Sequence, residues 1–190
     1  FQKLEDRFKN DKNIFVFNND AIDYNYEFIN KDQKSLIVGN LPFNISSQLL
    51  INWIVNYNWP PFYSKMVLMF QKEVANRIIS KHNQKSYSRI SVISQARCEI
   101  KTLLNAPSNI FFPKPKVDGT ILEFNPITKY LDIDISNLQK LLRKSFEHRR
   151  KKIKTSLKDY DYLLKRFDID EGLRAENLSV EDYCRLASAI

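Results

Sequence analysis

The stretch LIVGNLPF, residues 36–43, joins an apolar run of strand length to a polar turn. The run Ser35–Gly39 predicts a buried strand, and the turn Asn-Leu-Pro-Phe that follows Gly39 ends it. In open α/β sheets, ligands bind beyond the carboxyl ends of the strands. The sequence therefore predicts a ligand site at Asn40–Phe43.

Strand and helix patterns alternate on both sides of this stretch, over residues 1–126. Such alternation predicts an α/β fold, a sheet with helices on both faces. Beyond Pro126 only helical patterns occur, so we expect two domains, 1–127 and a helical 128–190. The expected strands are Asn13–Asp20, Ser35–Gly39, Met66–Phe70, Cys98–Leu104 and Gly119–Phe124, and the expected helices are Phe1–Phe8, one capped by Ser46 or Ser47, Glu73–Ser80 and a short one after Tyr87.

Composition limits the partners of this chain. Thirty Lys and Arg against 22 Asp and Glu give a net charge of +8, which predicts a polyanionic partner. Cys98 and Cys184 lie far apart, as expected of buried free thiols in a reducing cytoplasm, and with two histidines they leave little material for a metal site. No apolar run is long enough for a membrane span. We expect a cytoplasmic monomer without metal.

The tetrapeptide Asn40–Phe43 suits the methylation of an exocyclic amine. The Asn40 side-chain oxygen and the Leu41 carbonyl could each accept one N–H bond, which would turn the nitrogen lone pair toward a methyl donor. Pro42 biases Leu41 toward an extended backbone, and Phe43 could stack on adenine for roughly 1–3 kcal/mol. The base would have to be unpaired or flipped out of a duplex. Taken alone, these four residues fit an ordinary strand-ending turn equally well.

Positive charge is concentrated in residues 143–158. Eight basic residues and one acid, Glu147, give this segment +7, nearly the whole net charge. Interleaved apolar residues predict a helix that packs on one side and faces phosphates on the other, although a solvated helix face would look the same. The following stretch, Arg174–Ile190, predicts a helix that packs against it. The basic residues are Arg143, Lys144, Arg149, Arg150, Lys151, Lys152, Lys154 and Lys158.

The sequence resembles the small-subunit ribosomal RNA adenine dimethyltransferases, the KsgA-type family, over nearly its whole length. Seven blocks match in order and spacing. They are FNNDA (17–21), VGNLPFNIS (38–46), QKEVANR (71–77), YSRISV (87–92), FFPKPKVD (111–118), HRRK (148–151) and RAENLS (174–179).

This resemblance implies a Rossmann-like S-adenosylmethionine-dependent methyltransferase sheet with a small all-α C-terminal domain that contacts RNA. The implied activity is methyl transfer to the exocyclic amines of two adjacent adenines near the 3′ end of small-subunit rRNA, in ribosome biogenesis. The implied partner is the small ribosomal subunit, and the implied cofactor is S-adenosylmethionine.

The resemblance also implies roles for individual residues. Asp20 matches a carboxylate that accepts from the adenine amine of the donor, and Asn40 matches a residue that touches both the donor and the target amine. Phe43 and Phe111 match two aromatics that sandwich the flipped base. Asp20 could instead be a turn or helix-cap residue, and Phe111 a buried anchor. The residues implied to bind RNA are Arg149, Arg150, Lys151, Lys152 and Lys154.

Two departures from the family pattern concern the donor and the target. Phe43 replaces the commoner Tyr, which removes a hydroxyl but keeps the ring. None of the three glycines lies in a Gly-rich strand-to-helix turn, so we expect that unit to precede residue 1 and this chain to bind the donor weakly or not at all. Two other functions remain open, a non-catalytic RNA-binding or assembly factor, or a mitochondrial transcription factor on this scaffold. The helical tail and ordered blocks disfavour a DNA adenine methyltransferase.

Overall fold

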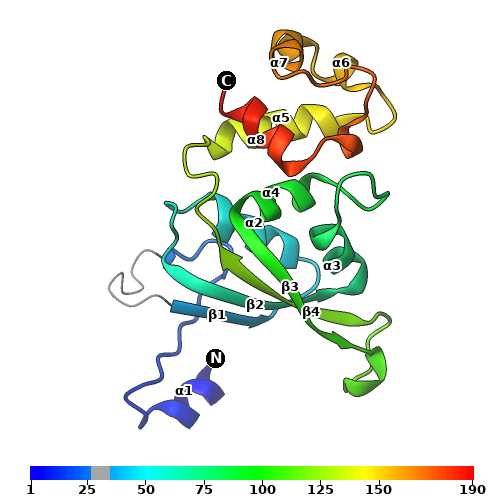
Figure 1. The fold of residues 1–190 in the computed structure, drawn as a ribbon. Helices are drawn as coiled ribbons and strands as arrows, with labels where there is room; N and C mark the ends of the chain where they lie inside the picture. The colour runs from blue at the N-terminus through cyan, green and yellow to red at the C-terminus, as the bar shows by residue number, and fades with distance from the viewer. Residues whose placement is uncertain (27–34) are drawn as a thin grey trace.

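Four strands form one sheet in the computed structural model of the chain, which describes residues 1–26 and 35–190 (Figure 1). Their order across the sheet is β1-β2-β4-β3. β1 runs parallel to β2, whereas β4 runs antiparallel to both β2 and β3. The strands are β1 (Ser35–Asn40), β2 (Tyr63–Gln71), β3 (Cys98–Ala106) and β4 (Gly119–Pro126).

Helices are present near the positions that the sequence predicted. The cap of α2 was predicted wrongly, because its N-cap is Ile45, and the Ser46 hydroxyl donates instead to the Phe43 carbonyl at 3.1 Å. The helices are α1 (Gln2–Phe8), α2 (Ser46–Val55), α3 (Lys72–Ile79), α4 (Arg89–Arg97), α5 (Ile135–Glu147), α6 (Ile153–Ser156), α7 (Asp161–Arg166) and α8 (Val180–Ala187).

One face of the sheet carries the first part of the core. Met66, Leu68 and Phe70 alternate along β2 toward this face and pack with buried residues of α2 and α3. The opposite face holds polar pairs such as Lys65–Glu123, whose Nζ and Oε2 lie 2.8 Å apart. Among the described residues, helices thus cover one face of the sheet, and the prediction of helices on both faces was wrong for this part of the chain.

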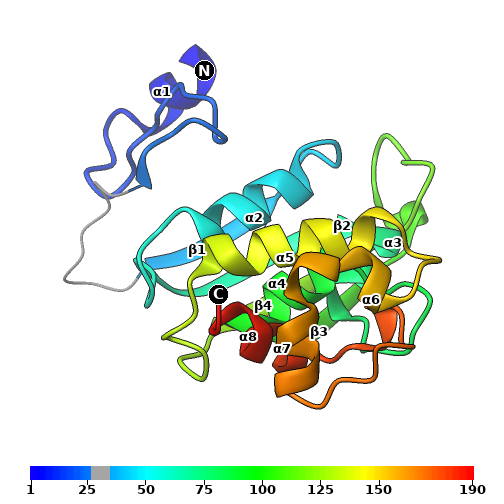
Figure 2. The ribbon, with the colours of Figure 1, turned by 90° about the horizontal axis from the view of Figure 1, so that it is seen from above.

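The strand predicted over Asn13–Asp20 does not form. Phe15 and Phe17 are 76% and 66% exposed, and the segment is irregular. Four successive apolar residues favour a strand, but a strand also needs a neighbour that accepts its ladder of hydrogen bonds. No described strand supplies that neighbour. The segment follows α1, which lies away from the sheet in both ribbon views (Figures 1 and 2) and has no buried residue.

The C-terminal part is all-helical, and α5 and α8 lie on α4 (Figure 2). Its core joins Ile93 of α4 to Leu138 of α5 and Tyr183 of α8. At the expected domain boundary, Ile127 donates its N–H to the Arg97 carbonyl at 2.8 Å and accepts from Trp59 Nε1 at 2.7 Å. The division at residue 127 stays a prediction, and the two bonds hold Ile127, the last residue of the first part, to the end of α4 and to the loop after α2.

The prediction that the basic segment forms one helix was wrong. α5 ends at Glu147 because His148, at φ −126° and ψ 75°, leaves the helical region. A turn follows, in which the Lys151 N–H donates to the His148 carbonyl at 2.9 Å, and α6 then has four residues. The cluster of like charges at residues 149–152 disfavours a continuous helix, because charges one turn apart repel one another.

Both cysteines are free and buried, as the sequence predicted. Burial raises the pKa of Cys98 and of Cys184 to about 12. In the part of the chain that the structure describes, no group of three or more His, Cys, Asp or Glu residues could hold a metal ion. None of the described helices has both the length and the apolar character that crossing a membrane requires.

The packing of the tail on α4 predicts that the sheet and the helical tail unfold together. Leu138→Ala removes a fully buried side chain from α5 and should cost about 2–5 kcal/mol of unfolding free energy. Both tryptophans, Trp53 and Trp59, lie in the sheet part and report on it separately from circular dichroism. In urea, the two signals should shift to the same lower midpoint, whereas Lys140→Ala on the exposed side should leave it nearly unchanged. A tryptophan transition that stays at the wild-type midpoint would show that the two parts unfold independently.

Candidate functional site

A cavity of about 340 Å³ lies at the edge of the sheet where β1 and β2 end and β4 begins. Asn40, the last residue of β1, pairs with Met69 of β2, and Gly119 at the start of β4 pairs with Gln71. Because β4 is antiparallel to β2, the loop before it reaches the edge at which β1 ends. The cavity is lined by Asn40, Leu41, Pro42, Phe43, Met69, Phe111, Phe112, Pro113 and Pro115.

The turn after β1 is held from inside the protein. The N–H groups of Ile45 and Ser46 each donate to the Pro42 carbonyl at 3.1 Å, and the buried Ser46 hydroxyl donates to the Phe43 carbonyl. Within residues 1–26 and 35–190, the Asn40 side-chain amide and the Leu41 carbonyl have no hydrogen-bond partner. The backbone of the turn is therefore held in place, and the two acceptors expected to bind an amine are available.

Glycine at position 39 makes room for this turn. A Cβ atom there would lie 2.8 Å from Leu41 Cδ2 and 3.2 Å from Leu68 Cδ2, closer than carbon atoms approach without strain. A Cβ atom at this position would force the Leu41 side chain to shift. At Gly119, across the cavity, a Cβ would meet the flexible side chain of Met69, with the sulfur at 3.2 Å.

The loop between β3 and β4 brings the second aromatic. Asp118 fixes this loop, because its Oδ1 accepts from the Ser108 N–H and its carbonyl from the Lys72 N–H, both at 2.9 Å. Phe111 is half-buried and lines the same cavity as Phe43. The structure thus brings together all five residues predicted to be catalytic, Asn40, Leu41, Pro42, Phe43 and Phe111.

Four lining residues had not been predicted as site residues: Met69, Phe112, Pro113 and Pro115. Phe112 is fully exposed. Met69 lies on β2 and is the residue that pairs with Asn40 of β1. The place of Phe112 directly after Phe111 in a Pro-punctuated loop is a sequence signal that could have identified it. Met69 gave no such signal, because its position depends on the pairing of β1 with β2.

Asp20 does not line this cavity. Its Oδ1 accepts from the Ile22 N–H at 2.8 Å and its carbonyl accepts from the Tyr24 N–H at 3.0 Å, which is the alternative turn role. The segment after it is held on the core, since Tyr26 stacks on Phe62 with ring centroids 5.9 Å apart. A contact of Asp20 with a donor stays a prediction.

The five basic residues predicted to bind RNA differ in their surroundings. Arg149 Nη2 donates to the carbonyls of Lys85 and Tyr87, at 2.8 and 3.1 Å, and to Glu176 at 2.8 Å. Arg149 therefore fastens the turn after α5 to the loop before α4. The other four side chains, of Arg150, Lys151, Lys152 and Lys154, are exposed and have no hydrogen-bond or ion-pair partner among the described residues.

Comparisons with known proteins fit this site. The model of the family described as ribosomal RNA adenine dimethylase matches residues 1–190. Curated relatives called ribosomal RNA small subunit methyltransferase A include those of Allorhizobium ampelinum, 38% identical, and Rhizobium etli, 36% identical, each over 92% of this chain. The chain spans 64% of the length of each of these relatives.

Solved structures show the same fold. A dimethyladenosine transferase from Plasmodium falciparum superposes with a TM-score of 0.79 at 24% identity, covering 97% of this chain and 74% of that one. The 23S rRNA methyltransferase ErmE gives a TM-score of 0.65 at 19% identity, covering 97% and 75%. The chain thus has the Rossmann-like fold of rRNA methyltransferases.

The close approach at residue 39 gives a test of the turn. Gly39→Ala forces Leu41 to move and should cost about 1–3 kcal/mol of unfolding free energy, as overpacking does. Gly119→Ala, the matched change across the cavity, should cost less than about 1 kcal/mol because a Met side chain adapts. Urea unfolding measures both. Equal costs, or a larger cost at Gly119, would contradict the packing described for Leu41.

Proposed function

Because the chain belongs to the ribosomal RNA adenine dimethylase family, we propose that its protein methylates two adjacent adenines near the 3′ end of small-subunit rRNA. Methyl groups pass from S-adenosylmethionine to the exocyclic amines, as a step in ribosome biogenesis. The observation that carries this proposal is the cavity in which two free acceptors, at Asn40 and Leu41, lie with the rings of Phe43 and Phe111.

The geometry supports a mechanism of orientation. The two rings would hold an unpaired adenine by its faces, and its N–H groups would donate to the Asn40 amide oxygen and the Leu41 carbonyl. These bonds turn the lone pair of the amine out of conjugation with the ring and toward the methyl group. They also offset the positive charge that builds on nitrogen in the transition state. The methylated amine would then lose one proton to solvent, and its remaining N–H could donate to one of the two acceptors during the second transfer.

S-adenosylmethionine, when bound, supplies an electrophilic methyl group whose bond electrons stay with sulfur. Asn40 is the described residue that fits this donor, because its free amide lies at the carboxyl end of β1 beside the cavity. Asp20 is the other candidate, although its carboxylate is engaged in a turn.

Asn40→Ala tests the mechanism in the full-length protein. Removing one of two acceptors should lower methyl incorporation into undermethylated small subunits by about 10²–10³, the usual effect of losing one preorganised polar group. Binding of the subunits should stay at the wild-type level, and Asn44→Ala, outside the cavity, should keep full activity.

Full activity in the Asn40→Ala protein would refute this mechanism. A wild-type protein that binds subunits but transfers no methyl group would instead favour the non-catalytic assembly or transcription factor on the same scaffold.

We further propose that Arg150, Lys151, Lys152 and Lys154 contact rRNA phosphates, and that Arg149 positions them. Phosphate contacts need side chains that are exposed and free of protein partners, which these four are. Arg149 has three protein acceptors already, so its loss would act through the turn. The small ribosomal subunit would be the polyanionic partner that the net charge of +8 predicts.

This division of roles predicts two different phenotypes. Arg150→Glu with Lys151→Glu should weaken subunit binding and flatten its dependence on salt, while unfolding free energy stays within about 0.5 kcal/mol. Arg149→Ala should cost about 1–3 kcal/mol of stability, because it removes three hydrogen bonds, one of them to the carbonyl of the buried Tyr87. Filter binding across a salt series and urea unfolding measure the two effects. An unchanged salt slope in the double variant would exclude the phosphate contacts.

A further inference from the structure

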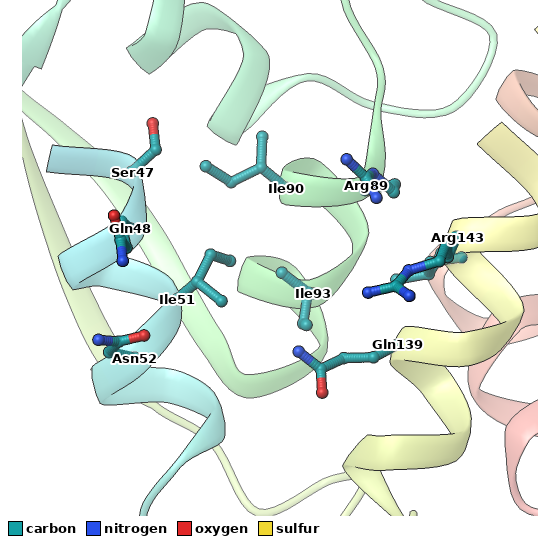
Figure 3. Close-up of a pocket in the computed structure, with 10 residues that line it drawn as sticks. Ser47, Gln48, Ile51, Asn52, Arg89, Ile90, Ile93, Gln139 and Arg143 are labelled. Carbon is teal, nitrogen blue, oxygen red and sulfur yellow. The ribbon is translucent and has the colours of Figure 1, made fainter. Parts of the chain in front are cut away.

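A second cavity, of about 400 Å³, lies between α2, α4 and α5 (Figure 3). It shares no lining residue with the cavity at Asn40–Phe43. One of its lining residues, Ser47, nevertheless lies in the first turn of α2, the helix that follows Asn40–Phe43 in the sequence. Its lining residues are Ser47, Gln48, Ile51, Asn52, Arg89, Ile90, Ile93, Gln139, Leu142 and Arg143.

Two arginines give this cavity its charge. Arg89 begins α4 and Arg143 lies on α5, and Figure 3 shows both on the same side of the cavity, opposite α2. No acidic residue lines the cavity, and neither guanidinium has a hydrogen bond or ion pair with the described residues. Unpaired guanidinium groups from two helices at one cavity suit a phosphate, which each can bind with two parallel N–H groups.

The rest of the lining suits the remainder of a nucleotide. Ile51 and Ile93 lie in the middle of the cavity in Figure 3 and offer an aliphatic surface for a base or ribose face. The side chains of Ser47, Gln48 and Gln139 surround them and have no partner in the described parts of the chain. Amides and hydroxyls can pair with base edges and the 2′-hydroxyl group, which an inorganic anion lacks. A volume of about 400 Å³ is within the range of small-molecule sites.

The position of the cavity indicates where that nucleotide comes from. The first turn of α2 connects the cavity to Phe43 of the adenine site. α5 extends from Gln139 and Arg143 to Glu147, after which the basic turn begins. The cavity therefore lies between the two places at which the proposed function puts RNA.

We propose that this cavity binds a nucleotide of the RNA strand flanking the target adenines, with its phosphate held by Arg89 and Arg143. The proposal rests on the proposed function for the identity of the RNA. It adds a subsite that holds the strand on the far side of α2 while the target base occupies the cavity at Asn40. The two guanidinium groups fix the strand, and the amides contact the base.

Arg89→Gln with Arg143→Gln tests the subsite in the full-length protein. The probe is a hairpin RNA that carries two unpaired adenines and single-stranded flanks. The double variant should bind it about tenfold more weakly, and the slope of log K against log salt should fall by about 0.7, the contribution of the one single-stranded phosphate that the two arginines hold. Lys81→Gln with Lys140→Gln removes the same charge outside the cavity and should change both quantities much less.

A second probe separates a phosphate contact from loss of fold. In it, methylphosphonate linkages replace the charged flanking phosphates. Wild-type protein should bind this RNA as weakly as the double variant binds the unmodified one, and the double variant should not discriminate between the two. An equal further loss in the double variant would overturn the proposal, as would binding of free adenosine monophosphate at the cavity without any coupling to the RNA flanks.

The same preparations distinguish this proposal from the proposed function. Methyl transfer is measured in parallel with wild-type and Asn40→Ala proteins. Coupling between the arginines and the flanking phosphates supports the subsite even where no methyl transfer is found, in which case the proposed activity fails alone. Normal methyl transfer without that coupling overturns the subsite and leaves the activity standing.

Discussion

The antiparallel direction of β4 against β2 is the constraint on which the rest of the site depends. β1 and β2 run parallel, so a third strand in their direction would end at the same edge and begin at the opposite one. Because β4 is antiparallel to β2, its first residue lies at the edge where β1 and β2 end, and the loop that carries Phe111 lies beside Asn40. The cavity is thus a product of topology as much as of its residues.

α4 has a comparable role for the whole molecule. It lies between the sheet and the C-terminal helices, and its residues Val92 and Ile93 belong to the core of the tail. Its first residue, Arg89, lines the second cavity, and its last, Arg97, accepts the hydrogen bond of Ile127. A single helix therefore sets the position of the tail, and with it that of the basic turn, relative to the adenine cavity.

Local patterns predicted most of the fold and the centre of the site. The apolar run before Asn40 and the Pro-punctuated loop at Phe111 are local signals, and both elements formed where expected. The prediction failed where partners decide the outcome. Asn13–Asp20 has strand propensity without a described strand beside it, and Arg149 is basic yet engaged with Glu176, which is distant in sequence. The cavity at Arg89 had no signal, because its three helices are brought together by tertiary packing.

The outer edge of β1 has a consequence for handling this chain in isolation. β1 is the last strand on its side of the described sheet, and its Leu36 and Val38 are exposed. An edge that offers free backbone groups and apolar side chains can add a strand from a second molecule, which leads to aggregation. The net charge of +8 opposes such contacts at low salt and does so less as salt screens it. Self-association that increases with ionic strength is therefore the behaviour expected of these residues alone.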